Sequence, residues 1–288
     1  MVPECAHRSP QSMLRTAKDY LKGTRFFPVL KCILRLYRRL LYGTHVGRRL
    51  ALWESVSFWD QWLAEALADR DHATRETFGC ISRLDRLDPN LPLSDYHRRF
   101  IDHLPEQDIF VLDVGAGPLT TLGKVHPFKR LHITATDVLA ADFESLLKKY
   151  QVDPPVRTIY ADAERLTDLF PANSFHLVNA ENAIDHTDDA LAAIVQMLWV
   201  VKEGCYVVLN HNHNEADHQN FEGLHQWNFT VVNGDFIIRR GAKEVNVTRE
   251  IAPLGDCESE LLEDFQIVRV HIRKKEGVTL QPRAPGLR

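Results

Sequence analysis

The chain has 288 residues and a formal net charge of −4, with 44% hydrophobic and 26% charged residues, an ordinary globular balance. This length allows one large domain or two small ones, and the acidic balance argues against general nucleic-acid binding, which needs a basic surface. The five cysteines are scattered and form no CxxC pair, so nothing indicates a disulfide framework or a thiolate zinc site. Without a bilayer-length apolar run or a secretory signal, we expect a cytoplasmic protein.

Positive charge is concentrated at the N-terminal end of the chain. Residues 1–50 carry an excess of +9, so the remainder carries −13. Within this region, apolar residues of the segment 29–42 recur at spacings of three and four, which predicts an amphipathic helix. Its other side carries Lys31, Arg35, Arg38 and Arg39. Two interpretations stay open: the basic helix contacts an anionic membrane surface, or it packs as a cap on the acidic remainder.

Two more helices are expected before the first strand. One covers Leu50–Leu67, whose aromatic residues we interpret as core, and the other covers Leu93–His103 after a proline break. We therefore expect residues 1–103 to form a helical extension and residues 104–288 to form the main domain.

From residue 109 onward, strand-like and helix-like segments alternate. The expected strands are Ile109–Val114, Leu131–Thr136, Val156–Tyr160, Phe175–Ala180 and Cys205–Asn210. Helical stretches such as 143–150 and 188–201 lie between most of them. This alternation predicts βαβ units and an α/β fold with a doubly wound, mostly parallel sheet.

The C-terminal part carries a different signal. Asn233-Gly234 separates two short apolar runs and supplies the positive φ angles of a type I′ turn, so we expect a late β-hairpin insertion there. The remaining elements expected are a helix over 258–265, a strand over 266–273 and a last strand over 278–281.

The strongest motif stands at the end of the first expected strand. The strand ends in Asp113 and runs into a loop with Gly115 and Gly117, which lack a Cβ and let main chain approach a ligand. Ligands of open α/β sheets bind at this carboxyl edge. Asp137 ends the next strand 24 residues after Asp113, close to the spacing of about 20 expected for an acid that accepts ribose hydroxyls.

Later strands end in further polar segments. Asp162-Ala163 follows the third strand, in a position to hold an amino-purine edge. The fourth strand ends at Ala180 and is followed by the polar run 181–186. Each feature alone has a bland explanation, but their order along successive strands points to a nucleoside-containing ligand.

In this order the motifs resemble those of the class I S-adenosylmethionine-dependent methyltransferases, over about residues 108–210. The segment 113–117 is similar to their first motif, 179–186 to the segment that closes over the cofactor, and 200–204 to the turn before their fifth strand. Leu119, Glu203 and Cys205 depart from the usual pattern. The resemblance implies a Rossmann-like methyltransferase fold and S-adenosyl-L-methionine as cofactor. The cofactor-binding residues that it implies are Asp113, Gly115, Gly117, Asp137, Val138, Asp162, Ala163 and Ala180.

Two alternatives use the same fold. An NAD(P)-dependent oxidoreductase would need a third glycine where this chain has Thr120, because the dinucleotide pyrophosphate sits against the start of a helix there. A non-catalytic binding module would be expected to have lost the glycine loop or the ribose acid. Both are present, which favours the enzyme.

A histidine-rich stretch, residues 210–229, follows the fifth strand, where the methyl end of the cofactor would lie. His225 is the first candidate for a general base and His186 the second, because imidazole titrates near neutral pH. Asp185 is placed to orient either one, and a structural role stays open for both histidines.

The same stretch raises the question of a metal. His211 and His213 would share one side of a strand, with Glu215, His218 and Asp185 nearby, but no spacing is diagnostic of an ion. We therefore expect no metal and a polar pocket for a small-molecule acceptor. The expected acceptor is an oxygen or nitrogen nucleophile on a small polar molecule. The polar pocket and the basic helix together suggest a sugar or lipid-linked glycan, and natural-product and protein acceptors stay open.

Overall fold

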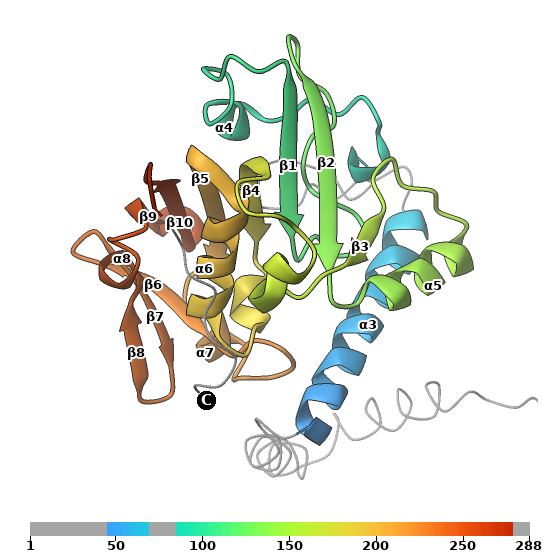
Figure 1. Cartoon of the computed structure of the whole chain (residues 1–288). Coiled ribbons are helices and arrows are strands. Elements are labelled where there is room, and N and C mark those ends of the chain that lie inside the picture. Colours follow the sequence, from blue (N-terminus) through green and yellow to red (C-terminus); the bar gives the residue numbers. More distant parts are fainter. Residues whose placement is uncertain (1–44, 69–84, 279–288) are drawn as a thin grey trace, which may run out of the picture. The chain divides into compact units, whose positions relative to one another are not determined.

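The computed structural model describes residues 45–68 and 85–278 (Figure 1). Contacts divide the chain into two compact units, residues 1–49 and 50–288, and the sheet lies in the second. The basic helix expected over residues 29–42 falls outside the described residues. Within the described ranges, no helix is long and apolar enough to cross a membrane.

The core is a seven-stranded sheet in the order β3-β2-β1-β4-β5-β10-β9. Its strands are β1 (Asp108–Val114), β2 (Arg130–Asp137), β3 (Thr158–Tyr160), β4 (Phe175–Glu181), β5 (Val201–Asn212), β9 (Gly255–Leu262) and β10 (Ile267–Lys274). Strands β1 to β5 pair in parallel, and β10 runs antiparallel between β5 and β9. The expected doubly wound, mostly parallel sheet of a Rossmann-like α/β fold is confirmed.

Helices and a small second sheet surround this core. The helices are α3 (His45–Ala68), α4 (Asp95–Arg98), α5 (Ala140–Tyr150), α6 (Ala190–Val200), α7 (Glu215–His218) and α8 (Val247–Glu250), with 3₁₀ turns η1 (Asp85–Leu87), η2 (Ala163–Asp168), η3 (Ile184–His186) and η4 (Glu263–Phe265). The second sheet contains β6 (Asn228–Val232), β7 (Asp235–Arg240) and β8 (Lys243–Asn246). It contains the predicted hairpin, whose turn residues Asn233 and Gly234 have φ angles of 53° and 84°.

Neighbouring residues of the central strands point to opposite faces of the sheet and build two cores. Leu112 and Val178 pack in a cluster with α6 and the hairpin residues Phe229 and Phe236. Val111, Leu177 and Val208 pack on the other face with Leu93, Phe100 and Ile101 from the segment before β1. The continuous apolar strands follow from this two-sided burial.

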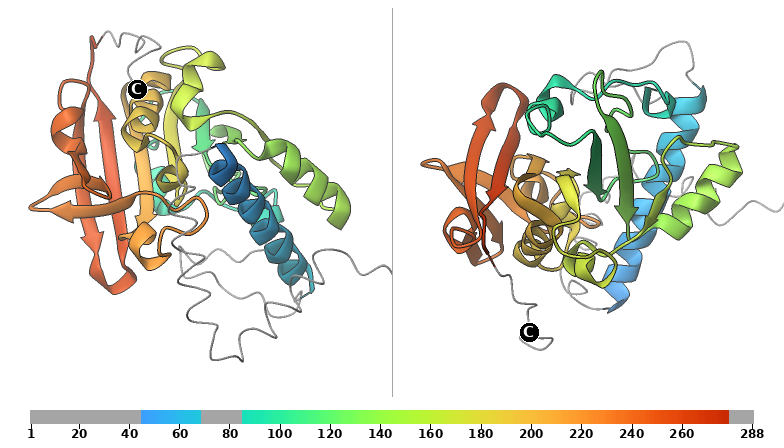
Figure 2. Two further views of the ribbon diagram at one scale, coloured as in Figure 1. Left: turned by 90° about the horizontal axis from the view of Figure 1, so that it is seen from below. Right: turned by 45° about the horizontal axis from the view of Figure 1, so that its top comes forward.

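A third cluster lies at the side of the sheet that carries β2 and β3. From Leu50 onward, α3 packs Trp62 and Leu63 against Phe143 and Leu147 of α5, and Figure 2 shows these two helices side by side. Leu119, from the loop after β1, joins this cluster. Trp62 and, in part, Trp59 are therefore core, as predicted, and Trp59 lies against the first motif at Gly117. For Trp53 and Phe58 the prediction is wrong, because these side chains are 52% and 59% exposed.

Two predicted helices differ in the structure. The helix expected over 258–265 is wrong: Gly255–Leu262 is strand β9, followed by the short turn η4. Alternate residues of β9 are exposed, because it is an edge strand with one polar side. Only Asp95–Arg98 of the expected Leu93–His103 helix is α-helical. Ser94 is the N-cap and has an extended backbone, the Leu93 N–H bonds to the Val125 carbonyl, and turns follow Arg98. Of the last expected strand, Val278 belongs to no strand and the remainder lies outside the described residues.

Candidate functional site

The order of the strands creates a switch point between β1 and β4. Strand β1 pairs with β2 on one side and with β4 on the other, although β2 and β3 lie between β1 and β4 in the chain. The loops that follow β1 and β4 therefore leave the sheet next to each other at its carboxyl edge. Open α/β sheets bind their ligands in the crevice at such a point.

The glycine loop after β1, residues 115–117, is held tightly in this crevice. Gly115 and Gly117 have φ angles of 69° and 65°, which other residues adopt only with strain. A Cβ on Gly115 would lie 2.3 Å from the Cβ of Ala183, and a Cβ on Gly117 would lie 2.7 Å from Cζ2 of Trp59. The loop thus packs against the loop after β4 and under the α3 tryptophan. Residues 115–129, all described, contain no helix.

Asp137 stands at the end of β2, facing the glycine loop. Its Oδ2 accepts a hydrogen bond from the Gly117 N–H at 3.2 Å, and its Oδ1 accepts one from the Leu139 N–H at 2.9 Å. Burial raises the pKa of this carboxyl to about 6, against the effect of these two donors. Val138, beside it, packs on the cluster shared by α3 and α5.

Asp113 is buried and takes part in an internal hydrogen-bond network. Its Oδ2 accepts a bond from the Thr120 hydroxyl at 2.6 Å, and its Oδ1 accepts one from the Asn179 amide at 2.8 Å. His97 Nε2 lies 3.2 Å from Asn179 Oδ1, and Ser94 Oγ lies 2.8 Å from His97 Nδ1. Burial raises the pKa of Asp113 and lowers that of His97 to about 4.

This network ties the glycine loop to β4 and to the segment before β1. His97 was not predicted from the sequence as a member of the site region. Asn179, a polar residue within an apolar strand, belongs to the segment expected to close over the cofactor, but no role of its own was predicted for it. Thr120, where a dinucleotide motif would have glycine, instead places a hydroxyl on the buried carboxyl of Asp113. Asp113 is therefore a buried residue that holds the loop in place through Thr120 and does not itself face the crevice.

The other predicted cofactor residues lie along the same edge. Asp162 caps η2, its Oδ1 accepting a bond from the Glu164 N–H at 2.9 Å, and Ala163 begins that turn. Ala180 is buried in β4. Glu181, which follows it, accepts a 2.7 Å bond from the hydroxyl of Thr121 in the loop after β1.

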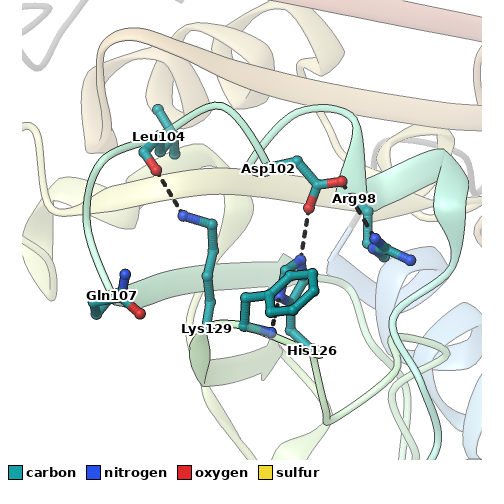
Figure 3. Close-up of a pocket in the computed structure, with 7 residues that line it drawn as sticks. Arg98, Asp102, Leu104, Gln107, His126 and Lys129 are labelled. Atoms are coloured by element: carbon teal, nitrogen blue, oxygen red, sulfur yellow. Dashed lines mark hydrogen bonds and ion pairs between the residues drawn. The ribbon is translucent and has the colours of Figure 1, made fainter.

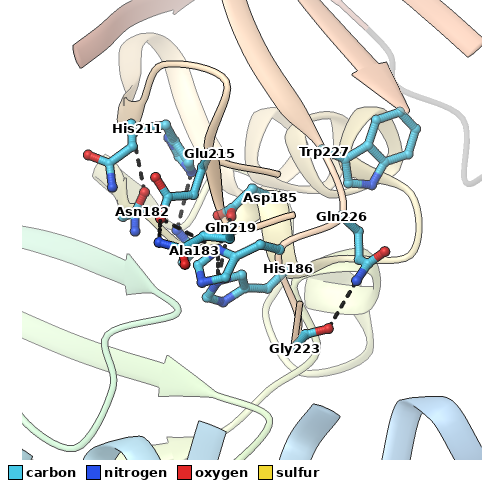
Figure 4. Close-up of polar contacts among 12 residues, drawn as sticks. Asn182, Ala183, Asp185, His186, His211, Glu215, Gln219, Gly223, Gln226 and Trp227 are labelled. Carbon is cyan, nitrogen blue, oxygen red and sulfur yellow. Dashed lines mark hydrogen bonds and ion pairs between the residues drawn. The ribbon is translucent and has the colours of Figure 1, made fainter. Parts of the chain in front are cut away.

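The three predicted catalytic residues come together in one cluster, which we call the 185–186–225 cluster. Figure 4 labels two of them, Asp185 and His186. His225 Nδ1 lies 2.8 Å from Asp185 Oδ2. His186 Nε2 lies 3.1 Å from His225 Nδ1 and 3.5 Å from Asp185 Oδ2. Asp185 and His186 belong to η3 after β4, whereas His225 comes from the segment that leads into the hairpin.

Backbone hydrogen bonds hold these two segments together. The N–H groups of Gln226 and Trp227 donate to the Asp185 carbonyl oxygen at 3.0 and 3.3 Å, and the Trp227 indole donates to the Thr187 carbonyl at 2.9 Å. From β5, His211 Nε2 accepts bonds from the Ala183 and Ile184 N–H groups at 3.3 and 3.0 Å. The loop after β4 is thus fixed from both sides.

Burial and neighbouring charges shift the pKa values of these side chains in different directions. Burial by itself disfavours the Asp185 carboxylate, but His186 and His225 bring its pKa down to about 2. Burial lowers the pKa of His225, and Asp185 more than offsets this, so that the net shift is upward. Burial lowers the pKa of His186, and it lowers that of His211 to about 4. His211 is therefore neutral, with its proton on Nδ1.

The metal set considered from the sequence does not assemble. His211 is occupied by backbone donors, and His213 contacts Gln266 at 3.2 Å and Thr230 at 3.0 Å. His218 is exposed on α7. Among the described residues, Asp185, His186 and His225 form a group of three potential ligands whose ligand atoms lie within 4.8 Å of one another.

A pocket of about 420 Å³ lies at the opposite edge of the sheet (Figure 3). It is lined by Arg98, Asp102, Leu104, Gln107, His126, Phe128 and Lys129. Its polar groups bond to one another, since His126 Nε2 lies 2.6 Å from Asp102 Oδ1 and the Lys129 ammonium donates to the Leu104 carbonyl at 2.6 Å. Because it faces the amino ends of β1 and β2, it is remote from the glycine loop.

Residues 112–209 match the family model described as methyltransferase domain. No curated protein matches the sequence. Solved structures similar to this chain include the YcgJ protein from Bacillus subtilis, at 16% identity over 63% of this chain and 98% of that chain, with a TM-score of 0.36. A chain of the complex between the Haloferax volcanii Trm112 methyltransferase activator and the putative methyltransferase is similar at 12% identity over 77% and 98%, with a TM-score of 0.45.

Proposed function

This chain belongs to the class I S-adenosylmethionine-dependent methyltransferases, and we propose that it methylates an oxygen or nitrogen of a small polar acceptor. The observation that carries the proposal is the 185–186–225 cluster beside the glycine loop. It combines a buried carboxylate with two imidazoles at the carboxyl edge of the sheet. Such a group can hold a nucleophile and remove its proton.

The donor set at the glycine loop fits S-adenosylmethionine. We propose that Gly115 and Gly117 pass beneath its methionine part, that Asp137 and Val138 receive the ribose, and that Asp162 and Ala163 lie beside the adenine. Ala180 supports this surface from within β4. Asp113 contributes through Thr120 and Asn179, which fix the loop.

On the acceptor side, we assign to His225 the role of base or acceptor anchor, with Asp185 orienting it and His186 as the second candidate. His225 turns Nδ1 toward Asp185, which leaves Nε2 for the acceptor. The cofactor supplies an electrophilic methyl group on its sulfonium. The chain's part is to align the nucleophile in line with that methyl, since orientation lowers the barrier substantially.

The surroundings of the cluster favour a hydroxyl-rich acceptor, a sugar or a lipid-linked glycan. Glu215, Gln219 and Gln226 lie around it, as Figure 4 shows. The buried Oε1 of Gln226 has no hydrogen-bond partner within the described part of the chain. Amide and carboxylate groups of this kind suit the hydroxyls of a sugar.

The cofactor assignment is tested through Asp137. Calorimetry with S-adenosylhomocysteine should show saturable binding that Asp137→Ala weakens severely. The pKa of Asp137 is raised to about 6, so at lower pH the free protein carries the protonated carboxyl. The ionised form is the better acceptor of ribose hydroxyls, so binding below pH 6 must release a proton. Affinity should then fall about tenfold per pH unit below 6 and stay level above it.

Asp137→Asn is the matched control, because the amide cannot titrate. Its affinity should be lower than that of the wild type at pH 8 and flat between pH 5 and 8. Tight binding of NAD with none of S-adenosylhomocysteine would contradict the cofactor assignment.

We propose further that residues 1–103 form an extension whose basic segment 29–42 contacts an anionic membrane. The +9 excess of residues 1–50 supports this. The protein should pellet with vesicles containing phosphatidylserine and be released by high salt. Replacing Lys31, Arg35, Arg38 and Arg39 by glutamine should abolish pelleting, with phosphatidylcholine vesicles as the control. Equal recovery on both vesicle types would leave the capping interpretation.

A further inference from the structure

We propose that the 185–186–225 cluster binds one divalent metal ion, with Glu215 as a fourth ligand, and that this ion holds the nucleophile of the acceptor. The ligands are two imidazoles and two carboxylates. The role of the ion in methyl transfer rests on the proposed function, but the site itself rests only on the geometry of these four side chains.

Three ligand atoms converge on one point. Asp185 Oδ2, His186 Nε2 and His225 Nδ1 are separated by 2.8, 3.1 and 3.5 Å. Two ligands of a tetrahedral zinc ion, each bound at about 2.1 Å, lie roughly 3.4 Å apart. Small side-chain rotations would therefore place all three atoms around one ion.

Hydrogen bonds among these three atoms satisfy them less well than a bound cation would. If His225 Nδ1 carries a proton, that N–H can point well at Asp185 or at His186, but not at both. If His186 Nε2 also carries one, two N–H groups face each other at 3.1 Å. A single cation would be bound by the lone pairs of all three atoms at once.

Two more carboxylate oxygens are available to the ion. Glu215 is buried, its Oε1 lies 4.0 Å from His225 Nδ1, and the Gln219 amide donates to that same oxygen at 2.9 Å and so orients it. The buried Oδ1 of Asp185 has no hydrogen-bond partner among the residues that the structure describes. An unpaired buried carboxylate oxygen is costly, and a cation would remove that cost.

Ligand type and exposure suggest which ion binds and where the acceptor enters. Two nitrogen and two oxygen ligands suit Zn²⁺, Mn²⁺ or Fe²⁺ better than Ca²⁺ or Mg²⁺, which prefer oxygen alone. The side chains of His186 and His225 are 29% and 24% exposed, so the site is open on one side. An acceptor hydroxyl can take that position.

The chemistry balances without a further reactant. With Nδ1 of His225 on the ion, its Nε2 carries the ring proton, so in this form His225 is a ligand and not the base. The positive charge of the ion lowers the pKa of an acceptor hydroxyl beside it, and the proton leaves to solvent through the open side. The oxygen then forms a bond to the methyl carbon while the carbon–sulfur bond breaks. The sulfonium becomes a neutral thioether, S-adenosylhomocysteine.

Metal binding is measured directly on the untagged full chain, first stripped with a chelator and then titrated calorimetrically with Zn²⁺ and with Mn²⁺. One equivalent should bind, and Co²⁺ should give a visible absorption band of a low-symmetry site. His186→Ala and His225→Ala should each weaken binding by at least about 10–100-fold. Glu215→Gln should weaken it less.

His213→Ala is the matched control, a histidine of the same stretch outside the cluster, and it should bind the ion as the wild type does. Every variant is also titrated with S-adenosylhomocysteine, which reports on the cofactor site independently. Failure of that titration in the wild type would contradict the proposed function and leave the metal measurement standing. Absence of Zn²⁺ and Mn²⁺ binding, or loss of binding in His213→Ala alone, would overturn the metal site. Full turnover in the stripped protein would overturn the role of the ion.

Discussion

Replacing His225 by alanine should slow methyl transfer by about 10²–10⁴-fold, the usual effect of losing a group that handles the acceptor's proton. The affinity for S-adenosylhomocysteine should stay within about twofold, because His225 contacts Asp185 and His186 and not the glycine loop. The rate is measured as S-adenosylhomocysteine release with whichever sugar acceptor supports turnover in the wild type. A large loss of rate with an intact cofactor site places His225 on the acceptor side.

Three further variants are needed to interpret the result for His225→Ala. His186→Ala tests the rival histidine of the cluster, and His213→Ala is the control outside it. Asp185→Asn keeps the shape of the side chain while removing the charge that raises the pKa of His225. Its rate should fall and its pH profile should change. Near-normal turnover in His225→Ala would show that this histidine is structural.

The second large effect is expected at Gly115. Gly115→Ala should lower the free energy of unfolding by about 2–4 kcal/mol, from the strained positive φ and from overpacking together. The added Cβ would lie 2.3 Å from the Cβ of Ala183, far inside an ordinary contact. Any shift that relieves this overlap moves the loop after β1 away from the loop after β4. We therefore expect S-adenosylhomocysteine binding to be lost as well.

The chain offers matched controls for both causes of the expected destabilisation, the strained backbone and the overlap with Ala183. Gly234 has a φ of 84°, and a Cβ added there would have nothing within 4 Å, so Gly234→Ala reports the backbone strain alone. Combining Gly115→Ala with Ala183→Gly removes the overlapping atom, and the double variant should recover part of the lost stability and binding. Chemical denaturation and calorimetry measure the two quantities. Equal losses at Gly115 and Gly234 would show that the contact with Ala183 does not matter.

Much of the fold and of the site could be predicted because the informative residues stand at strand ends. Ile109–Val114, apart from the exposed Phe110, and Phe175–Ala180 are mostly apolar runs buried on both faces, and such runs identify interior parallel strands. Their carboxyl ends meet at one edge, so the loops that carry Gly115 and Asp185 had to be neighbours in space. Asn233-Gly234 marked the hairpin for an equally local reason, its positive φ angles.

The rest depended on contacts that no local pattern carries. Strand β9 contains Glu and Leu, which favour helices, and only pairing along β10 makes it extended. Asp113 belongs to an internal network because Asn179 and Thr120 happen to reach it from two other segments. That His225 meets Asp185 could be proposed from position, but the backbone bonds that hold it there were not visible.

Strand β10 is the last described strand along the chain, yet it is an interior strand of the sheet, between β5 and β9. During synthesis, β9 leaves the ribosome before β10, the strand that joins it to β5. The edge of β5 that faces away from β4 consequently has no partner strand until Ile267–Lys274 has emerged. Only then can the His213 N–H donate to the Gln266 carbonyl, so the end of β5 on the acceptor side gains its last backbone contacts after the strands of the cofactor side have been synthesised.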